Sequence, residues 1–273
     1  QASTSQWYAG EAEVAAPAGV VLPGLSEIAI YSEDGNVLSI SGGSFQNTWT
    51  TENRLQVATT VQGPNAAHNV RLEYDADGLR TRMSHGGVTT DYVYDKAAGF
   101  GQLVLVKTSS GVTTSYVWAG DLVSQTDSRS GLSYFHADAH ASIRQLSDAS
   151  GASTDTYGYD AYGIQIDSTG TTPNLFHYAG EQRDDGISGA YYLRARYYNP
   201  GMGQFLSPDP HPGDVRDPRT LHKYAYANAS PMNFHDPSGL FSLLEMQLVA
   251  AAIGVSYALG GLIQVGVGLN DRR

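Results

Sequence analysis

The chain has 273 residues, 41% of them hydrophobic, which is enough for one large or two ordinary domains with a packed core. The formal net charge of −11 argues against a surface that follows nucleic-acid phosphates, so no nucleic-acid partner is expected. Cysteine is absent, which excludes disulfides and thiolate metal sites.

Residues 1–29 are predicted to form an extended N-terminal segment. Residues 1–20 lack the basic and apolar regions of a signal peptide, and Gln1 fits either a processed N-terminus or a fragment boundary. The Ala- and Val-rich stretch with Pro17 and Pro23 favours a strand that adds to an open sheet edge of a neighbouring subunit.

Residues 30–177 contain an internal repeat. An aromatic residue followed by an acidic residue, and often by glycine, recurs at a spacing of roughly 20 residues, which fits a strand–turn–strand unit. The copies begin at Tyr31, Tyr74, Tyr92, Tyr116, Tyr134 and Tyr157, with a degenerate copy at Trp49.

The segments between these copies have the pattern of half-buried strands. In residues 88–94 and 112–118, β-branched and aromatic side chains alternate with a period of two. Glycine-containing pairs that favour tight hairpin turns lie between such segments, namely Asp77-Gly78, Gly86-Gly87, Ser110-Gly111, Ser130-Gly131 and Ser150-Gly151. The sequence therefore predicts an all-β hairpin ribbon.

Residues 178–240 form a different module with two dense motifs. The first, residues 191–210, reads Tyr-Tyr-Leu-Arg-Ala-Arg-Tyr-Tyr, then a glycine turn, then Phe-Leu-Ser-Pro-Asp-Pro. The second, residues 221–240, contains Tyr224-Ala-Tyr226 and ends in Asp-Pro-Ser-Gly-Leu.

The repeats and both motifs resemble the YD-repeat (Rhs) family, which includes the C component of Tc toxins, wall-associated bacterial proteins and teneurins. The resemblance spans residues 30–240 and is most specific over 178–240. Three positions depart from the common pattern: Asn199 for Asp, His222 for Asn and His235 for Arg. The resemblance implies a β ribbon rolled into a barrel or shell, with an Rhs-associated core module as its cap.

The resemblance also implies a reaction, self-cleavage of the peptide between Leu240 and Phe241. By motif position, the two carboxylates would be Asp209 and Asp236, with Arg196 or Arg194 as the residue that orients or charge-stabilises the site. Two neighbouring carboxyl groups titrate separately, so one can take a proton from water while the other donates a hydrogen bond to the carbonyl.

A structural reading of the same motif remains open. Asp-Pro-Ser-Gly is a favourable type I turn, with Asp first, Pro second and Gly fourth. Asp236 would then only cap a turn made with Pro237, Ser238, Gly239 and Leu240.

Other groupings are weaker. His136 and His140 share a strand face around Asp138, but no third metal ligand is in view. Asp75 and Asp77 begin like a calcium loop that lacks its downstream Glu, and a β-turn explains them better. Packing also explains the Tyr and Trp side chains better than a sugar platform does. No metal or cofactor is expected.

Residues 241–273 are predicted to form an apolar C-terminal helix, and residues 246–269 carry no charge. We expect it to pack inside its own shell or against a neighbouring subunit. The alternatives are a membrane contact through 246–269, with Arg272 and Arg273 on the cytoplasmic side, and assembly like that of a pilin helix.

Taken together, the sequence predicts a secreted or cell-surface YD-repeat shell or scaffold of a bacterial polymorphic toxin or surface apparatus. At most it would cut its own chain after Leu240, and no turnover enzyme is expected. The alternative is a non-catalytic subunit of an extracellular self-assembling fibre or adhesin, in a homo-oligomer.

Overall fold

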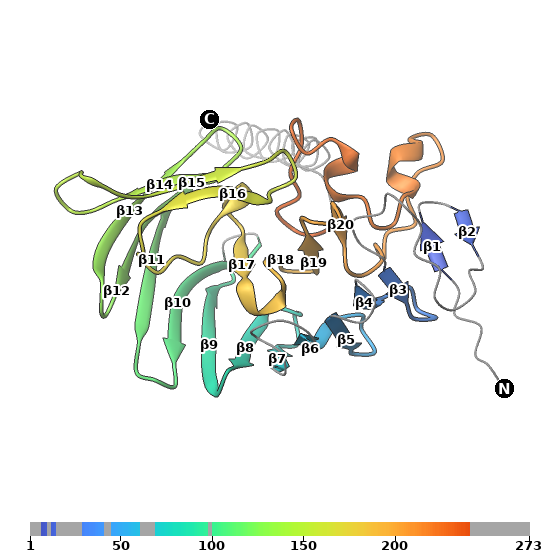
Figure 1. Cartoon of the computed structure of the whole chain (residues 1–273), viewed down its shortest axis with the longest axis horizontal. Helices are drawn as coiled ribbons and strands as arrows, with labels where there is room; N and C mark the ends of the chain where they lie inside the picture. Colours follow the sequence, from blue (N-terminus) through green and yellow to red (C-terminus); the bar gives the residue numbers. More distant parts are fainter. Residues whose placement is uncertain are drawn as a thin grey trace, which may run out of the picture.

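A computed structural model describes residues 7–9, 12–14, 29–40, 45–60, 69–97 and 100–240 (Figure 1). The predicted helix over residues 241–273, including the uncharged stretch 246–269, lies outside the described residues. In the N-terminal segment, β1 (Trp7–Ala9) and β2 (Ala12–Val14) form a two-stranded antiparallel sheet.

Fourteen antiparallel strands, each paired with its neighbours in the chain, make one large sheet from β3 to β16. The strands are β3 (Ala29–Tyr31), β4 (Val37–Ile40), β5 (Phe45–Trp49), β6 (Leu55–Thr60), β7 (Asn69–Tyr74), β8 (Arg80–His85), β9 (Val88–Asp95), β10 (Gln102–Thr108), β11 (Thr113–Ala119), β12 (Asp121–Asp127), β13 (Gly131–Ala137), β14 (Ile143–Ser147), β15 (Ser153–Tyr159) and β16 (Gln165–Thr169). The predicted all-β ribbon is thereby confirmed.

In several copies an Asp side chain forms the turn after the strand, whereas the Ser32 and Thr50 hydroxyls accept the turn amides after Tyr31 and Trp49. Asp75 Oδ1 accepts the amides of Asp77 at 3.0 Å and Leu79 at 2.9 Å, and Asp160 does the same for the amides two and four residues on. The glycine before the closing residue, Gly78 or Gly163, has a positive φ. A side-chain oxygen thus takes up amides that the ladder leaves unpaired, which is why Asp occurs at this position.

A common register accompanies these turns. Tyr31 pairs with Val37, and Tyr74 pairs with Arg80, each six positions later and each after a shift in the ladder. Such shifts increase the local twist of a strand pair. Repeated along the ribbon, they are consistent with the curvature of the large sheet in Figure 1.

The module after the repeats lies against the concave side of the large sheet (Figure 1). It contains a four-stranded antiparallel sheet in the order β17-β18-β19-β20 and short 3₁₀ helices. The strands are β17 (Gln182–Asp184), β18 (Ala190–Leu193), β19 (Arg196–Asn199) and β20 (Gln204–Phe205), and the 3₁₀ helices are η1 (Tyr178–Gly180), η2 (Asp185–Ile187), η3 (Pro218–Leu221) and η4 (Tyr226–Ala229).

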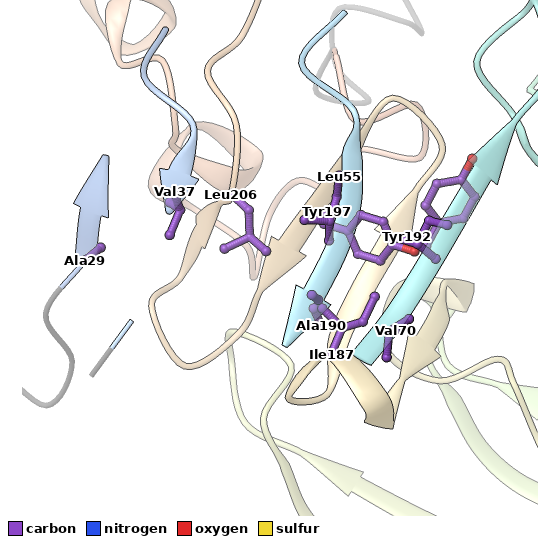
Figure 2. Close-up of a cluster of buried hydrophobic side chains, with 11 residues drawn as sticks. Ala29, Val37, Leu55, Val70, Ile187, Ala190, Tyr192, Tyr197 and Leu206 are labelled. Atoms are coloured by element: carbon purple, nitrogen blue, oxygen red, sulfur yellow. The ribbon is translucent and has the colours of Figure 1, made fainter. Parts of the chain in front are cut away.

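Every residue of β18 and β19 is buried, although two of the eight are not apolar. Their tyrosines alternate between two clusters. Tyr192 and Tyr197 join Leu55 and Val70 of the large sheet (Figure 2), whereas Tyr191 and Tyr198 join a cluster with Phe205 and Tyr226. The doubled Tyr-Tyr pairs therefore supply both faces of the small sheet with core residues, as the period-two geometry of strands requires.

The predicted rolling produces a curved sheet and not a closed barrel. In the described part of the chain, no strand joins β3 to β16, so these two strands are the edges of an open sheet. The core module lies inside the curve of the sheet (Figure 1). Among the described residues, no helix has the length and apolar character needed to span a membrane.

Candidate functional site

The site lies where the tight turn between β18 and β19 meets residues 236–240. Leu193 and Arg196 are the paired residues that flank this turn, and Arg194 within it has a φ of 57°. The amide of Ala195 donates to the Ser238 carbonyl at 3.2 Å. The Leu-Arg-Ala-Arg and Asp-Pro-Ser-Gly motifs are therefore in direct contact.

Gly239 is required by this contact. Its φ is +72°, and a Cβ there would lie 2.4 Å from the Leu193 carbonyl oxygen. A residue with a side chain would force the two motifs apart.

Arg196 brings the two predicted carboxylates together. Its Nη2 lies 3.0 Å from Asp209 Oδ2 and 3.7 Å from Asp236 Oδ2. Its Nε donates to the Gly239 carbonyl, and its Nη1 donates to the Lys223 carbonyl at 3.2 Å. The side chains of Arg196 and Asp236 are each 4% exposed, and that of Asp209 is 19% exposed.

Burial lowers the pKa of Arg196, while the charges of Asp209 and Asp236 raise it. The guanidinium also lies over the ring of Phe205, 3.7 Å from its centroid. A guanidinium has no other accessible protonation state in a protein, so this arginine remains a cation that offsets the repulsion between the two carboxylates.

Asp236 also performs the turn function. Its Oδ1 accepts the amides of Ser238, Gly239 and Leu240 at 3.2, 2.8 and 3.2 Å, and the Ser238 hydroxyl at 2.9 Å. The structural reading and the chemical reading thus use different oxygens of one carboxylate, Oδ1 for the turn and Oδ2 for Arg196. The catalytic role assigned to Asp209, Asp236 and Arg196 stays a prediction.

Arg194 leads to a residue that sequence reasoning did not single out. Its Nη1 pairs with Glu181 and also donates to the Pro237 carbonyl at 2.7 Å. Burial raises the pKa of Glu181 to about 7, opposed by Arg194 and aided by the negative charge of Asp236. Glu181 lies outside both motifs, and only its position at the start of the core module was available as a signal.

The side chains of the two weaker metal-site candidates, His136 with His140 and Asp75 with Asp77, contact other residues. His136 bonds to Ser147 through its ring at 2.8 Å, whereas His140 packs against His235 at 5.1 Å between ring centroids. Lys96 lies 2.8 Å from Asp75 and also pairs with Asp77, in the place where a cation would bind. In the described ranges, no group of three or more His, Cys, Asp or Glu side chains is arranged to hold a metal ion.

The three departures from the family pattern also have visible contacts. Asn199 Oδ1 accepts the amides of Gly201 and Met202 at 2.8 and 3.2 Å, which an Asp would do equally. His222 Nδ1 accepts the Tyr224 amide at 3.3 Å. His235 packs against a histidine of the repeat sheet, and burial lowers its pKa to about 4.

Sequence comparison identifies long relatives. The chain is 37% identical over 217 residues to the tRNA3(Ser)-specific nuclease WapA of Bacillus spizizenii and 37% identical over 215 residues to the tRNA nuclease WapA of Bacillus subtilis, in each case over 77% of this chain. WapA proteins are Rhs/YD-repeat proteins. The chain belongs to the Rhs/YD-repeat family. No model of a protein family matches it.

Solved structures agree on the Rhs fold. A TcdB2–TccC3 crystal structure matches 77% of the chain with a TM-score of 0.61 and 20% identity. The Tc holotoxin pore of Photorhabdus luminescens matches 78% with a TM-score of 0.63 and 19% identity. The chain spans only 9% of the length of the WapA relatives and 11% of these two structures.

Proposed function

We propose that this Rhs chain is the closing end of a YD-repeat shell of a polymorphic toxin, secreted or held at the surface of a bacterium. The matches to WapA and to Tc toxin structures support this assignment. The nuclease activity in the WapA names is that of proteins of which 9% is matched, and the net charge of −11 in this chain disfavours a tRNA surface here.

Within this shell, we propose that the core module cuts its own chain between Leu240 and Phe241. The observation that carries the proposal is the position of Asp209 and Asp236 on one buried guanidinium, which also binds the Gly239 carbonyl one residue before the scissile bond. Aspartyl hydrolysis needs two carboxyl groups close to the peptide that is cut.

In the proposed reaction, water attacks the Leu240 carbonyl carbon while the ionised carboxylate of the Asp209–Asp236 pair takes a proton from it. The protonated carboxyl group of the pair donates a hydrogen bond to the carbonyl oxygen, and Arg196 stabilises the negative charge. When the C–N bond breaks, the proton passes to the nitrogen of Phe241, which leaves a new carboxylate at Leu240 and a new amine at Phe241.

The test is intact mass with N-terminal sequencing of the smaller fragment, for the wild type, Asp209→Asn and Asp236→Asn. We expect a new N-terminus at Phe241 in the wild type only. Asp185→Asn is the matched control, since that side chain is 80% exposed and makes its ion pair with Arg183, away from the Asp209–Asp236 pair. A fragment that starts at Pro237 would indicate acid scission of the Asp–Pro bond, and an uncut wild-type chain would refute self-cleavage.

The bonds of Asp236 Oδ1 favour a second function, a non-catalytic scaffold or fibre subunit. Four donors satisfy that oxygen, which is sufficient reason for an Asp at this position. The open edges β3 and β16 are where a neighbouring subunit would add a strand. An uncut chain that elutes as a concentration-dependent oligomer would favour this function, whereas a cut monomer would exclude it.

A further inference from the structure

Residues 236–240 are held from two sides by the two arginines of the Leu-Arg-Ala-Arg turn. Arg196 donates to the Gly239 carbonyl and pairs with Asp209 and Asp236. Arg194 donates to the Pro237 carbonyl and pairs with Glu181. The two predicted catalytic carboxylates, Asp209 and Asp236, thus pair with Arg196. A third carboxylate, that of Glu181, pairs with Arg194.

Glu181 is placed by the boundary between η1 and β17. Its amide donates to the Tyr178 carbonyl at 3.0 Å, and its carbonyl accepts the His177 amide at 3.0 Å. Its side chain is 5% exposed, beside an Arg194 side chain that is 14% exposed. A buried cation without a counter-charge is strongly unfavourable, so Arg194 depends on Glu181 for its position.

The turn that carries Arg194 is also fixed from the repeat sheet. Arg54, from the turn between β5 and β6, donates to the carbonyls of Arg194 and Ala195 at 2.9 and 3.0 Å. With the backbone held on that side, the direction of the Arg194 guanidinium is set by Glu181 and Pro237. A change at Glu181 is therefore transmitted to the peptide that precedes Ser238.

We propose that Glu181 is a positioning residue for cleavage after Leu240: through Arg194, its carboxylate holds the Pro237 carbonyl and so sets where residues 237–240 lie relative to Asp209 and Asp236. This inference rests on the proposed self-cleavage. It assigns the site a third acidic residue that lies outside both sequence motifs.

Because Glu181 is buried, its proposed effect on the position of residues 237–240 depends on pH. Burial raises its pKa to about 7, so the carboxylate that holds Arg194 is present above that pH and is lost below it. The ionisable groups around it are Arg194, Asp236 and Tyr226, together with Asp121, Asp138 and His235 in the wall of the same cavity, whose volume is about 760 Å³.

The experiment follows cleavage of the full chain, pulse-labelled by cell-free synthesis and transferred to buffers from about pH 5.5 to about 8.5, a range that brackets the ordinary His pKa and the raised pKa of Glu181. In the wild type we expect the rate to fall as the pH falls through about 7. Glu181→Gln, which keeps a hydrogen-bond acceptor without the charge, is expected to cut about tenfold or more slowly at high pH. Its rate should also not change over this range.

The outcomes separate the two proposals. If the wild type cuts, Asp236→Asn does not, and Glu181→Gln keeps the wild-type rate and profile, the role of Glu181 is refuted and self-cleavage stands. If the wild type does not cut, both fail. Should Glu181→Gln lose its fold by circular dichroism, the wild-type profile still decides, because a rate without a step near pH 7 overturns the inference. Asp185→Asn should keep the step.

Discussion

Arg80 and Asp184 form an ion pair that is buried on both sides, with exposed side-chain fractions of 0% and 1%. Arg80 begins β8 of the repeat sheet, and Asp184 ends β17 of the core module. The guanidinium also donates to Tyr197 at 2.6 Å and to Gln182 at 2.9 Å, and it lies 4.3 Å from the centroid of the Tyr92 ring. The pair is thus a buried charged junction between the repeat sheet and the core module.

We expect Arg80→Met or Asp184→Asn alone to lower the free energy of unfolding by about 3–5 kcal/mol, because each leaves a buried group without its partner. The double variant Arg80→Met/Asp184→Asn should cost less than the sum of the two single changes. Urea unfolding of the four proteins measures this coupling.

The control for this pair is Arg82→Met. Arg82 lies two residues along the same strand and pairs with Asp91, but both side chains are about half exposed. Its removal should leave stability almost unchanged, since water screens such pairs. Equal losses at Arg80 and Arg82 would contradict the role of burial.

Gly239→Ala should lower stability by about 1–3 kcal/mol and reduce self-cleavage, because the new Cβ would displace residues 236–240 from Leu193. Gly111→Ala is the matched control. That residue has a similar φ of +86°, but a Cβ added there would meet no atom within 4 Å, so only the backbone cost remains. Thermal unfolding and the cleaved fraction are the two measurements.

Arg196→Lys should slow self-cleavage by about 10²-fold, provided the chain cuts. A lysine keeps the charge but cannot reach Asp209, Asp236 and the Gly239 carbonyl together, since it lacks the planar fork of donors. The rate of release of the fragment from residue 241 checks this expectation. A wild-type rate would mean that charge alone is sufficient.

His177 predicts how stability changes with pH. Burial, aided by the charge of Arg183, lowers its pKa to about 4. The folded state therefore binds fewer protons than the unfolded state between about pH 6.5 and about 4, and stability falls as the pH falls through this window. The loss is on the order of 3 kcal/mol.

Glu181 acts in the opposite direction over an overlapping range. Its raised pKa means that the folded state binds more protons, so its contribution to stability falls as the pH rises toward about 7. The two effects are separated by urea unfolding of the wild type and His177→Asn at several pH values. The difference between the two proteins should shrink as the pH falls from about 6.5, and a constant difference would contradict the titration of His177.

The repeat units were predictable because each hairpin is determined by residues that lie close together in the sequence. All the glycine pairs named in the sequence have a glycine at positive φ, including Gly78, Gly111 and Gly151. Alternation likewise predicted the strands, and Tyr92 and Tyr116 are buried as expected. The degree of curvature of the sheet was not predictable, because it depends on twist accumulated over fourteen strands and on the volume of the core module.

Within the site, the motifs predicted Asp209, Asp236 and Arg196, and the structure places these three in contact. Glu181 was missed, since no spacing rule links it to a partner 13 residues away across two strands and a 3₁₀ helix. The Arg80–Asp184 junction was missed for the same reason, as its residues are separated by 104 positions. Pairings of distant residues need the tertiary structure, whereas turns need only a few consecutive residues.

The strict neighbour-to-neighbour order of the large sheet has a consequence for synthesis of the chain. Each hairpin can form as soon as its second strand leaves the ribosome, because its contacts are local. Arg80, however, has no counter-charge until Asp184 has been made, and Arg54 has no acceptors in the core module until Arg194 and Ala195 exist. The ribbon is therefore expected to stay loosely curved until residues 181–195 have been made, after which their contacts with Arg54 and Arg80 fix its shape.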